Sequence, residues 1–577
     1  MRWLTIVLFS AAVATGQQLE VSVSNGASFI NAGSAAPGSL VAIQLLPQPG
    51  QPIPLIDPTT VYVTLQPSGA PYAMECAVVP LNGGFGTFLG LGPVIALLPA
   101  STPTGPAQLN LFYNGFKASA QVEILPASFG LFTMSRGFGP AVAQQVTSDH
   151  TLSKNQLTHP AKPGDYVVLY GTGLGSVTQD QVTVMLGGKP ARVTWAGPAP
   201  GEPGVDTINL VVPDDSSIPN DCYVAVWVEI AGVKSNAASI SKTSDGSACQ
   251  SSLGLTAVDL TVLDFGGMAP LAQLTFSAMV TPPLATELQG DFSSLQGPAT
   301  AGGFERIESA DFTALSQPAP IIAQISGDVI ADDVFFGCSA SPPTLSAKIG
   351  LFSIPNLIDF GNKVTLSRPG AALDLTSPNA IQSVSDGNVQ LFHSFYSGGQ
   401  ISPTVSDPSL LPAPLFAPGT WTFSGGPGRS FMGLATGAPF AQQLMLPPEI
   451  MATNFSALQS ISRQQDQTVT WDPAGFSDQD VVTVMLNGNS DAGRTFGGRT
   501  TITCKAPAAA GQMAIPATLL QFVAPGKPSF PGGAVIELSA GRKSGQAQTF
   551  TLPLSDGTSL PAVMRFSSSE IWPVAIQ

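Results

Sequence analysis

The sequence predicts an all-β protein of several domains. Glycine (60) and proline (52) are abundant, 44% of the residues are hydrophobic and only 10% are charged. A disordered chain would be poor in apolar residues, whereas short strands separated by Gly/Pro turns account for both features. A chain of 577 residues is too long for a single core, so three to five domains are expected.

The first half of the chain contains a weak internal repeat. In each copy a Pro-Gly turn leads into an apolar strand, and a Gly-containing hairpin turn precedes the last strand. These landmarks are at residues 36–43, 114–119, 162–169 and 231–236. Matching landmarks lie roughly 120 residues apart, the size of a β-sandwich domain. We therefore expect two immunoglobulin-like sandwiches, over residues 17–127 and 128–247.

Alternation of polar and apolar residues defines the strands of the second unit. Residues 181–186 (QVTVML) and 191–195 flank Gly187 and Gly188, which predict a two-residue turn. Further strands are expected at 206–212 (DTINLVV) and 222–230 (CYVAVWVEI). No stretch has a 3.6-residue period long enough for a crossover helix, which argues against parallel βαβ units.

Beyond Cys249 the pattern is less regular. Residues 248–450 are expected to form an irregular β-rich domain, with strands such as 258–265 (VDLTVLDF) and 418–423 between long Pro/Ser/Gly loops. Residues 304–315 fit either a short helix or strands, and strands or loop are favoured. A C-terminal β-sandwich is expected over residues 451–577, with β segments at 467–471, 481–486, 500–504 and 570–576.

The N-terminus has the order of a secretory signal peptide. Arg2 precedes an apolar run over residues 3–13, and Ala12-Val13-Ala14 supplies small residues for cleavage. The run is too short to span a bilayer, and no later apolar stretch reaches the required length. We expect residues 1–16 to be removed and a soluble mature chain, starting near residues 15–17, to be exported to the periplasm, cell surface or medium.

The charge balance excludes two classes of partner. The formal net charge is −15 because Lys and Arg together number only 22. No basic stripe is available for a phosphate backbone, so nucleic-acid binding is not expected. An acidic, thinly charged surface also has no attraction for anionic lipid.

The glycine-rich run VVLYGTGLGSV over residues 167–177 resembles a phosphate-binding loop at first sight. A dinucleotide fingerprint needs G-x-G-x-x-G and then a helix whose N-terminus holds the pyrophosphate. Gly171, Gly173 and Gly175 are instead spaced G-x-G-x-G, and the following residues predict a turn and a strand. No cofactor-binding residue is therefore assigned.

The same glycines resemble those of an IPT/TIG domain, which has an immunoglobulin-like fold. In such domains the opening strand ends in a G-x-G-hydrophobic-G bulge, and the next hairpin carries a G-G-x-x-A turn, here Gly187 to Ala191. Residues 206–213 and 232–236 match the later strands. The resemblance implies a structural role for the glycines, which permit positive φ and close backbone approach.

Three further segments extend the resemblance. Residues 24–29 (SNGASF), 130–133 (GLFT) and 149–152 (DHTL) are similar to segments of the Solibacter-type uncharacterised C-terminal domain family of secreted acidobacterial proteins. That family typically has Asp-Gly-Thr-Leu where this chain has His150. The resemblance covers roughly residues 20–245. It implies a fold and a lineage but no activity, because the family has none assigned.

Five cysteines, without any C-x-x-C or Cys/His cluster, indicate disulfides with one thiol left over. Sequence alone allows 15 connectivities. Cys222 begins one strand and Cys249 lies just past the next, so antiparallel neighbours would bring them within disulfide distance; the resembling family also carries a cysteine at each place. Cys338 and Cys504 are then paired by elimination, with Cys76 as a buried free thiol.

Catalytic motifs are absent from the sequence. The three histidines, His150, His159 and His393, lack metal-binding spacing, and residues 428–433 (GRSFMG) lack the spacing of a nucleophile elbow. Residues 487–493 (NGNSDAG) lack the carboxylates of a calcium loop. No catalytic or metal-binding residue is assigned, although the paired carboxylates of a glycosidase need no fixed spacing.

Two functions fit these observations. The favoured one is a non-enzymatic extracellular module for binding, adhesion or structure, with a polysaccharide or protein ligand. The alternative is a secreted carbohydrate hydrolase or lyase with its site in residues 248–450. An acidic cluster beside an aromatic platform would indicate the enzyme, whereas flat sandwich faces and exposed edge strands would indicate the module.

Overall fold

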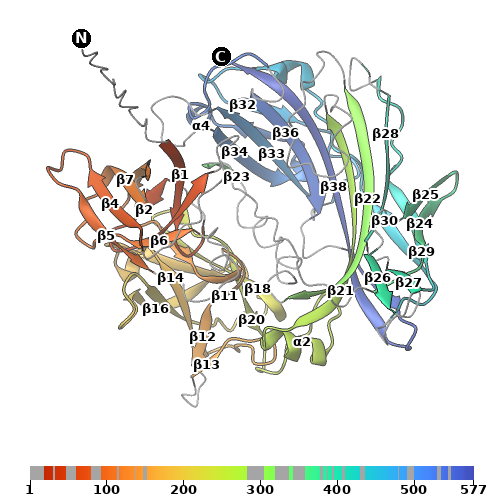
Figure 1. Cartoon of the computed structure of the whole chain (residues 1–577), viewed down its shortest axis with the longest axis horizontal. Coiled ribbons are helices and arrows are strands. Elements are labelled where there is room, and N and C mark those ends of the chain that lie inside the picture. The colour runs from red at the N-terminus through yellow and green to blue at the C-terminus, as the bar shows by residue number, and fades with distance from the viewer. Residues whose placement is uncertain are drawn as a thin grey trace, which may run out of the picture.

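A computed structural model of the chain shows an all-β protein, which confirms the predicted fold class (Figure 1). The structure describes residues 18–29, 33–46, 60–79, 93–113, 116–135, 137–146, 152–281, 304–318, 322, 337–341, 358–376, 381–385, 388–392, 395–403, 405, 410–428, 436–477, 480–489, 499–528, 534–542 and 548–577. The expected signal peptide, residues 1–16, lies outside the described residues.

The first sandwich closes into a ring of strands. Within its described part the order β1-β3-β6-β5-β4-β7-β8 returns to its start, because β8 also pairs with β1. Alternate side chains point into the ring, where Val23, Val41, Leu65 and Leu109 are buried. The strands are β1 (Gln18–Asn25), β2 (Ser34–Ala35), β3 (Leu40–Leu46), β4 (Tyr62–Pro67), β5 (Met74–Val79), β6 (Val94–Leu97), β7 (Gly105–Tyr113) and β8 (Phe116–Ile124).

The second sandwich consists of two sheets that share strand β16. Residues 189–191 of this strand pair with β15 and residues 192–198 pair with β17, with a bulge between Val193 and Trp195. Leu169, Val184 and Leu210 belong to the buried core between the sheets. The strands are β9 (Gly130–Leu131), β10 (Thr133–Ser135), β11 (Phe138–Ala141), β12 (Ala143–Val146), β13 (Leu152–Lys154), β14 (Tyr166–Thr172), β15 (Val182–Leu186), β16 (Lys189–Pro198), β17 (Asp206–Val211), β18 (Asp221–Ile230), β19 (Val233–Lys234) and β20 (Ala238–Lys242).

The predicted two-residue turn between β15 and β16 is confirmed. Gly187 and Gly188 have φ of 55° and 80°, and Leu186 pairs with Lys189 across the turn. Positive φ at both central residues twists the hairpin in the same sense as its strands, which explains why glycine occupies both positions.

Fourteen of the remaining described strands form one large sheet, so the domain boundary expected at residue 450 does not separate two sheets. β38 pairs in parallel with β21 and antiparallel with β36 and β37, and thus joins strands from 248–450 to strands from 451–577. Figure 1 shows β38 running beside β21 and β22 and on into the blue C-terminal strands. Local alternation carries no information on a pairing between segments almost 300 residues apart, so the sequence could not predict it.

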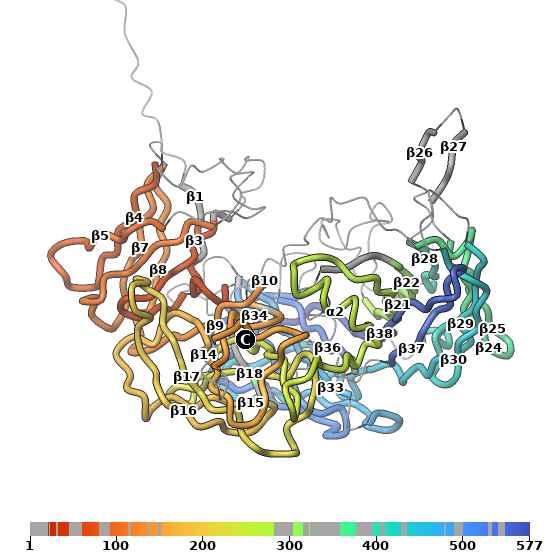
Figure 2. Tube along the Cα trace, turned by 90° about the horizontal axis from the view of Figure 1, so that it is seen from below, coloured from red at the N-terminus to blue at the C-terminus, as the bar shows by residue number. Residues whose placement is uncertain are grey.

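Two cores lie along this sheet. The larger is rich in aromatic side chains, among them Phe276, Phe312, Tyr396 and Trp421; the smaller contains Trp471 and Trp572. Figure 2 shows β28, β29 and β30 at the opposite end of the molecule from the first sandwich. The strands of this sheet are β21 (Met268–Thr281), β22 (Glu305–Pro318), β23 (Gly337–Ser341), β24 (Lys363–Arg368), β25 (Ala371–Thr376), β28 (Phe395–Ile401), β29 (Gly419–Gly425), β30 (Phe440–Leu446), β31 (Ser460–Ile461), β33 (Asp480–Asn489), β34 (Arg499–Pro507), β36 (Ala534–Arg542), β37 (Gln548–Pro553) and β38 (Ser559–Ile576).

Three small elements accompany this sheet. The pair β26 (Ile381–Ser385) and β27 (Asn388–Phe392) is one hairpin, β32 (Gln467–Thr470) pairs with β35 (Gln512–Ile515), and the short helix α4 spans Ala517–Leu520. The favoured strand at residues 304–315 is confirmed as part of β22, and the strands expected at 467–471, 481–486, 500–504 and 570–576 correspond to β32, β33, β34 and the end of β38.

The strand expected at residues 258–265 is wrong, because the segment is the helix α2 (Ala257–Asp264). Thr256 and Asp259 form a reciprocal capping box at its start. Leu260 and Leu263 are buried on its inner face, whereas Val258 and Val262 are exposed. The cap and this one-sided burial outweigh the strand-like alternation of the sequence. None of the described helices has the length and apolar character needed to span a membrane.

A buried asparagine joins the two sandwiches. Asn25, at the end of β1, donates from Nδ2 to the carbonyl oxygens of Ser128 (2.8 Å) and Thr172 (3.0 Å). Its Oδ1 accepts from the backbone amides of Ala27 (2.8 Å) and Ser28 (3.0 Å). One side chain thus holds its own turn, the linker between the sandwiches and the end of β14.

The glycine-rich run at residues 171–175 takes part in the same contact between the sandwiches. We call this contact, formed by Asn25, the linker at residues 126–130 and residues 171–175, the joint. Gly173 has a φ of 102°, and a Cβ atom there would collide with the Ser128 carbonyl oxygen. Gly175 faces Pro126 in the same way, and Gly171 lies against the Phe129 ring. The run therefore opens no helix. Its glycines let the end of β14 approach the linker closely, which is the structural role that the IPT/TIG resemblance implied.

We expect Gly173→Ala to destabilise the second sandwich by about 3 kcal/mol, because it combines an unfavourable φ with a backbone collision. Gly188→Ala is the matched control. Its φ is also positive (80°), but no atom lies within 4 Å of the added methyl group, so a loss of about 1 kcal/mol is expected. Denaturant unfolding followed by the fluorescence of buried Trp227 gives the comparison. Equal losses for both variants would contradict the role of the joint.

Candidate functional site

A pocket of about 350 Å³ lies at one edge of the second sandwich. The chain crosses there from one sheet to the other, because β11 pairs with β20 and β12 pairs with β14. Helix α2 forms a further part of the wall through Leu263 and Asp264. The other lining residues are Met134, Pro140, Ala141, Val142, Ala143, Gln144, Lys154, Asn155, Gln156, Leu157, Tyr170, Cys222, Tyr223, Ser239 and Ser241.

Two hydroxyl groups in the pocket wall have no hydrogen-bond partner among the described residues. The Tyr223 hydroxyl and the Ser241 Oγ are both buried. Tyr223 is 7% exposed to solvent and Ser241 is 3% exposed. A buried polar group without a partner costs about 1–3 kcal/mol. Both residues line the pocket, but the hydroxyl oxygens themselves are closed off from solvent, so a bound molecule could supply the missing hydrogen bonds only after these side chains shift.

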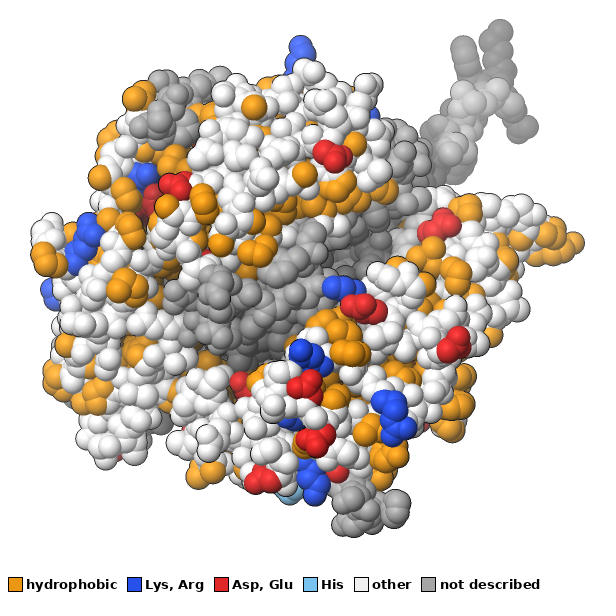
Figure 3. All heavy atoms as spheres, turned by 180° about the vertical axis from the view of Figure 1, so that it is seen from behind, with side chains coloured by type: hydrophobic (Ala, Val, Ile, Leu, Met, Phe, Trp, Pro, Cys, Tyr) orange, Lys and Arg blue, Asp and Glu red, His pale blue; other side chains and the backbone are white. Residues whose placement is uncertain are grey.

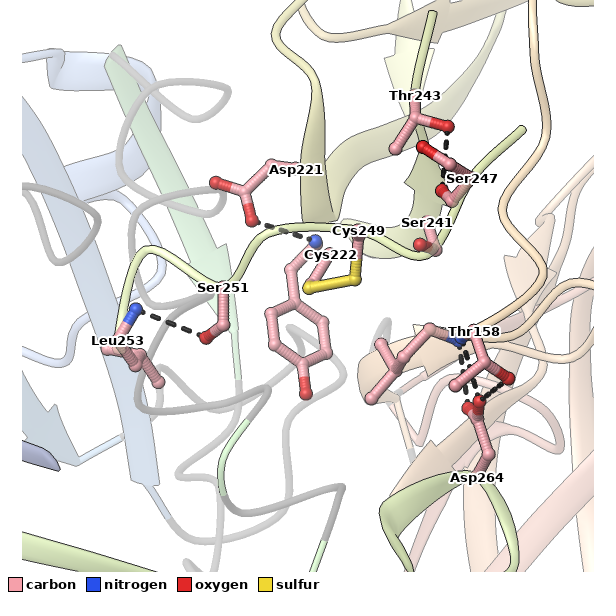
Figure 4. The surroundings of a disulfide bond; sticks show 12 residues. Thr158, Asp221, Cys222, Ser241, Thr243, Ser247, Cys249, Ser251, Leu253 and Asp264 are labelled. Atoms are coloured by element: carbon pink, nitrogen blue, oxygen red, sulfur yellow. Dashed lines mark hydrogen bonds between the residues drawn. A yellow bond between two sulfur atoms is a disulfide. The ribbon is translucent and has the colours of Figure 1, made fainter. Parts of the chain in front are cut away.

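A disulfide holds one side of the pocket. Cys222 and Cys249 are bonded, with Cα atoms 5.1 Å apart, and they tie the segment that leads to α2 to the start of β18 (Figure 4). Leu253, Leu260 and Leu263 pack in the same cluster beside Tyr223. Closing a loop of this length stabilises a fold by roughly 3–4 kcal/mol on the chain-entropy model.

The second disulfide lies elsewhere, between Cys338 of β23 and Cys504 of β34, whose Cα atoms are 4.0 Å apart. Cys76 is buried in the first sandwich as a free thiol, and burial raises the pKa of this thiol to about 11. The structure thus contains the two pairs expected from the sequence.

The loop that forms the pocket rim is fixed by side-chain hydrogen bonds. Asp264 accepts from the amides of Leu157 and Thr158 (both 2.8 Å) and from the Thr158 hydroxyl (2.6 Å), as Figure 4 shows for Thr158. Asn155 donates to the Ser241 carbonyl oxygen (2.9 Å) and accepts from its amide (2.8 Å). The pocket is therefore bounded by strands, by a helix with a capped N-terminus and by a loop that hydrogen bonds hold in place. Such an arrangement suits a preformed site.

The chemistry of the pocket is that of hydrogen bonding. Burial raises the pKa of Tyr223 well above its usual range, and the nearby carboxylates of Asp221 and Asp264 raise it further. The phenol therefore stays protonated near neutral pH and can donate or accept a hydrogen bond. Tyr170, on the same wall, donates to Gln144 Oε1 (2.6 Å).

The histidine within the described residues makes no catalytic pair. His159 is exposed in the loop at the pocket rim, and its Nδ1 lies 3.0 Å from the Thr158 hydroxyl. His150, His393 and Ser430 lie outside the described residues, as do residues 490–493 of the weak calcium-like turn. No group of three or more His, Cys, Asp or Glu side chains in the described parts of the chain could hold a metal ion.

Buried carboxylates form a second cluster, between β22 and β38, which sequence reasoning missed. Glu308 accepts from the amides of Leu415 (2.9 Å) and Phe416 (2.8 Å). Arg306 lies 3.2 Å from Glu449, and Glu570 accepts from the amide of Ala452 (2.7 Å). These groups anchor two loops to the long strands. Only strand alternation could have indicated Arg306, Glu308 and Glu570, which fall at inward positions of β22 and β38, whereas Glu449 lies in the loop after β30.

Burial raises the pKa of two carboxylates in this cluster. It raises the pKa of Glu570 to about 7, and the single hydrogen bond from Ala452 opposes the shift only in part. It also raises the pKa of Glu449 to about 7, where Arg306 opposes the shift and Glu308 adds to it. The carboxylates are engaged by backbone amides and Arg306, so the cluster is an anchor rather than the open acidic site of a glycosidase.

Charged side chains are sparse and scattered on the face shown in Figure 3. Among the described residues the ion pairs include the exposed Lys363 and Asp374 (2.6 Å) and the partly exposed Lys234 and Glu229 (3.8 Å). Exposed pairs of this kind contribute little to stability.

Comparisons with known proteins identify no family. No protein-family model matches the chain, and no curated protein sequence matches it. Solved structures that align with it include SGBP-B of the mixed-linkage glucan utilization locus of Bacteroides ovatus (11% identity, 85% of this chain and 88% of that chain, TM-score 0.13). The S-layer protein rSbsC(31-844) aligns at 11% identity over 95% of this chain and 54% of its own length (TM-score 0.18). The I9–I11 tandem of titin aligns at 5% identity over 72% and 94% (TM-score 0.12). Similarity this distant concerns the all-β fold alone.

We expect the stability of the protein to fall as pH rises from about 4.5 to about 7, and Glu570→Gln to reduce that fall. The folded pKa of Glu570 lies above the ordinary value of 4.5, so the folded state retains a proton that the unfolded chain loses over this range. The cost is about 1.4 kcal/mol per pH unit, or about 3 kcal/mol over the range. The glutamine keeps an acceptor for Ala452 without the charge.

Urea unfolding at several pH values, followed by tryptophan fluorescence, measures this dependence. Glu75→Gln, at an exposed position of β5, is the control for the same chemical change and should leave the slope as it is. A Glu570→Gln protein whose stability varies with pH as steeply as the wild type would contradict the assignment.

Proposed function

We propose that the mature protein is a secreted, non-catalytic binding module that holds an extracellular ligand through its second sandwich. The observation that carries this proposal is the pocket wall with two buried, unpartnered hydroxyl groups, Tyr223 and Ser241. A site that retains unsatisfied polar groups sacrifices stability, and ligand binding is a reason to retain them.

Three further features support this proposal. The N-terminal sequence has the order of a signal peptide, two disulfides suit an oxidising compartment, and the net charge of −15 gives nucleic acid no basic surface. The resemblance of residues 24–29 and 130–133 to the Solibacter-type family, and of residues 163–193 to an IPT/TIG domain, is consistent with a secreted protein of immunoglobulin-like fold.

The enzymatic alternative predicts an acidic cluster beside an aromatic platform within residues 248–450. Among the described residues, Glu308 and Glu570 are buried and accept hydrogen bonds from backbone amides, and Glu449 is paired with Arg306. A hydrolase or lyase needs carboxylates that reach the scissile bond, so this cluster does not favour the alternative.

The test combines binding with the absence of turnover. The mature protein is applied to a glycan array and to a panel of soluble polysaccharides, and each mixture is assayed for new reducing ends and unsaturated sugar ends. We expect retention on at least one glycan without new ends. Release of ends, abolished when the protein is denatured, would overturn the non-catalytic assignment, and an absence of retention would overturn the choice of glycans.

Tyr223→Phe links the retention to the pocket. Removing an unpartnered hydroxyl should raise the free energy of unfolding slightly, by up to about 1 kcal/mol, while it weakens ligand binding. A variant that loses stability would show that the hydroxyl has a structural role, and unchanged retention would place the ligand elsewhere.

A further inference from the structure

The outer face of the sheet β16-β17-β14-β12-β13 is open to solvent beside the pocket. Inward residues such as Val167, Leu169 and Leu210 fill the core, so the residues between them point outward. The register aligns the outward residues in rows across the sheet. One row is Trp195, Asn209, Val168, Gln144 and Lys154, and the next is Arg192, Val211, Tyr166, Val146 and Leu152.

Aromatic rings on this face are placed for stacking. Trp195 is 49% exposed and Tyr166 is 45% exposed, on strands separated only by β17. Trp195 lies over Gly197, because a Cβ atom at Gly197 would be only 2.9 Å from Cζ2 and 3.3 Å from Cε2 of the indole. Only a glycine leaves room for the ring to lie against the strand, so its other side faces solvent.

Polar groups accompany the rings. The Oδ1 atom of Asn209, directly beside Trp195 in the row, is buried and has no hydrogen-bond partner among the described residues. On the other side, Gln144, Tyr170 and Lys154 belong both to this sheet and to the pocket wall. The outer face and the pocket are therefore continuous through β12, β13 and β14.

The two rows on the outer face carry positive charge, whereas the molecule as a whole is negatively charged. The two rows contain Lys154 and Arg192, both exposed, and no carboxylate, although the chain carries a net charge of −15. The two cations stand on the outermost strands, four strand spacings or about 19 Å apart. An extended anionic ligand crossing the strands would meet a cation at each side, with Trp195 on the same strand as Arg192 and Tyr166 between the two cations.

We propose that this face binds an acidic polysaccharide, whose sugar rings stack on Trp195 and Tyr166 and whose carboxylates meet Lys154 and Arg192. The apolar C–H faces of pyranose rings suit aromatic surfaces, and their hydroxyl groups suit the side-chain amide of Gln144. The pocket receives one end or a side group of the chain. The inference rests on the proposed binding function and specifies its ligand class.

Tryptophan fluorescence gives a local measurement. Trp195 is exposed, whereas the other tryptophans of the described chain, Trp227, Trp421, Trp471 and Trp572, are buried. Polygalacturonate, used as the probe, should protect Trp195 from quenching by acrylamide. Pectin of the same backbone with its carboxylates methyl-esterified is the matched neutral probe, and it should bind at least fivefold more weakly at low salt.

Variants separate stacking from charge. Trp195→Ala should weaken binding of polygalacturonate about tenfold, and Gly197→Ala should weaken it severalfold, because the added methyl group displaces the indole. Arg192→Gln and Lys154→Gln should each weaken binding at low salt and flatten its salt dependence. Tyr72→Ala, which removes an 81% exposed aromatic ring from the first sandwich, is the control and should bind as the wild type does.

The outcomes distinguish this inference from the function on which it rests. Equal binding of polygalacturonate by wild type and Trp195→Ala, with folding verified by circular dichroism, would overturn the stacking surface. Equal binding of both probes would overturn the acidic ligand. If neither probe binds while Tyr223→Phe still weakens retention on another glycan, the inference fails and the binding function stands.

Discussion

The side chain of Asn25 is the contact on which the arrangement of the first two sandwiches depends. Its amide bonds the linker at Ser128 and the end of β14 at Thr172, and its carbonyl oxygen shapes the turn that follows β1. Thr172 returns the contact, since its Oγ1 accepts from the Leu40 amide (2.9 Å) and donates to the Gly204 carbonyl oxygen (2.5 Å). All of these groups are shielded from water, where unmet hydrogen bonds are costly, so the joint is held in one geometry.

Fixing the joint also fixes the surface proposed to bind ligand. Thr172 ends β14, the strand that carries Tyr166 and Tyr170, and Gly204 lies in the turn between β16 and β17. On the far side of the second sandwich, the Cys222–Cys249 disulfide and the Asp264 contacts hold α2 against the pocket. The second sandwich is thus braced from both sides, and its outer face can present a preorganised row of rings and amides.

The sequence predicted those parts of the molecule that depend on short-range pattern. Strand alternation located β15, β17 and β18, and paired glycines located the turn at Gly187 and Gly188. β21 and β38 pair although they lie almost 300 residues apart in the sequence. Local sequence pattern therefore could not reveal that one sheet crosses the boundary expected at residue 450. The strand expected at 258–265 was wrong, because the alternation of apolar residues was interpreted with the two-residue period of a strand. The capping box at Thr256 and the burial of Leu260 stabilise a helix there instead.

The binding surface was predictable only in part. The glycine-rich run was correctly assigned a structural role, but its partners, Asn25 and the linker at residues 126–130, were not foreseen because the contact joins two domains. Trp195, Asn209 and Gln144 lie on three different strands, and only the register brings them into one row. The unpartnered hydroxyls of Tyr223 and Ser241 likewise become visible only once packing is known.

Hydrogen–deuterium exchange of the full-length mature protein, with and without Asn25→Ala, tests the central role of the joint most directly. We predict that the substitution speeds exchange together in peptides covering residues 25–40, 126–137 and 171–175, while peptides of β18 keep their protection. Exchange that increases only in residues 25–28, with the linker and the glycine-rich run as protected as in the wild type, would contradict it.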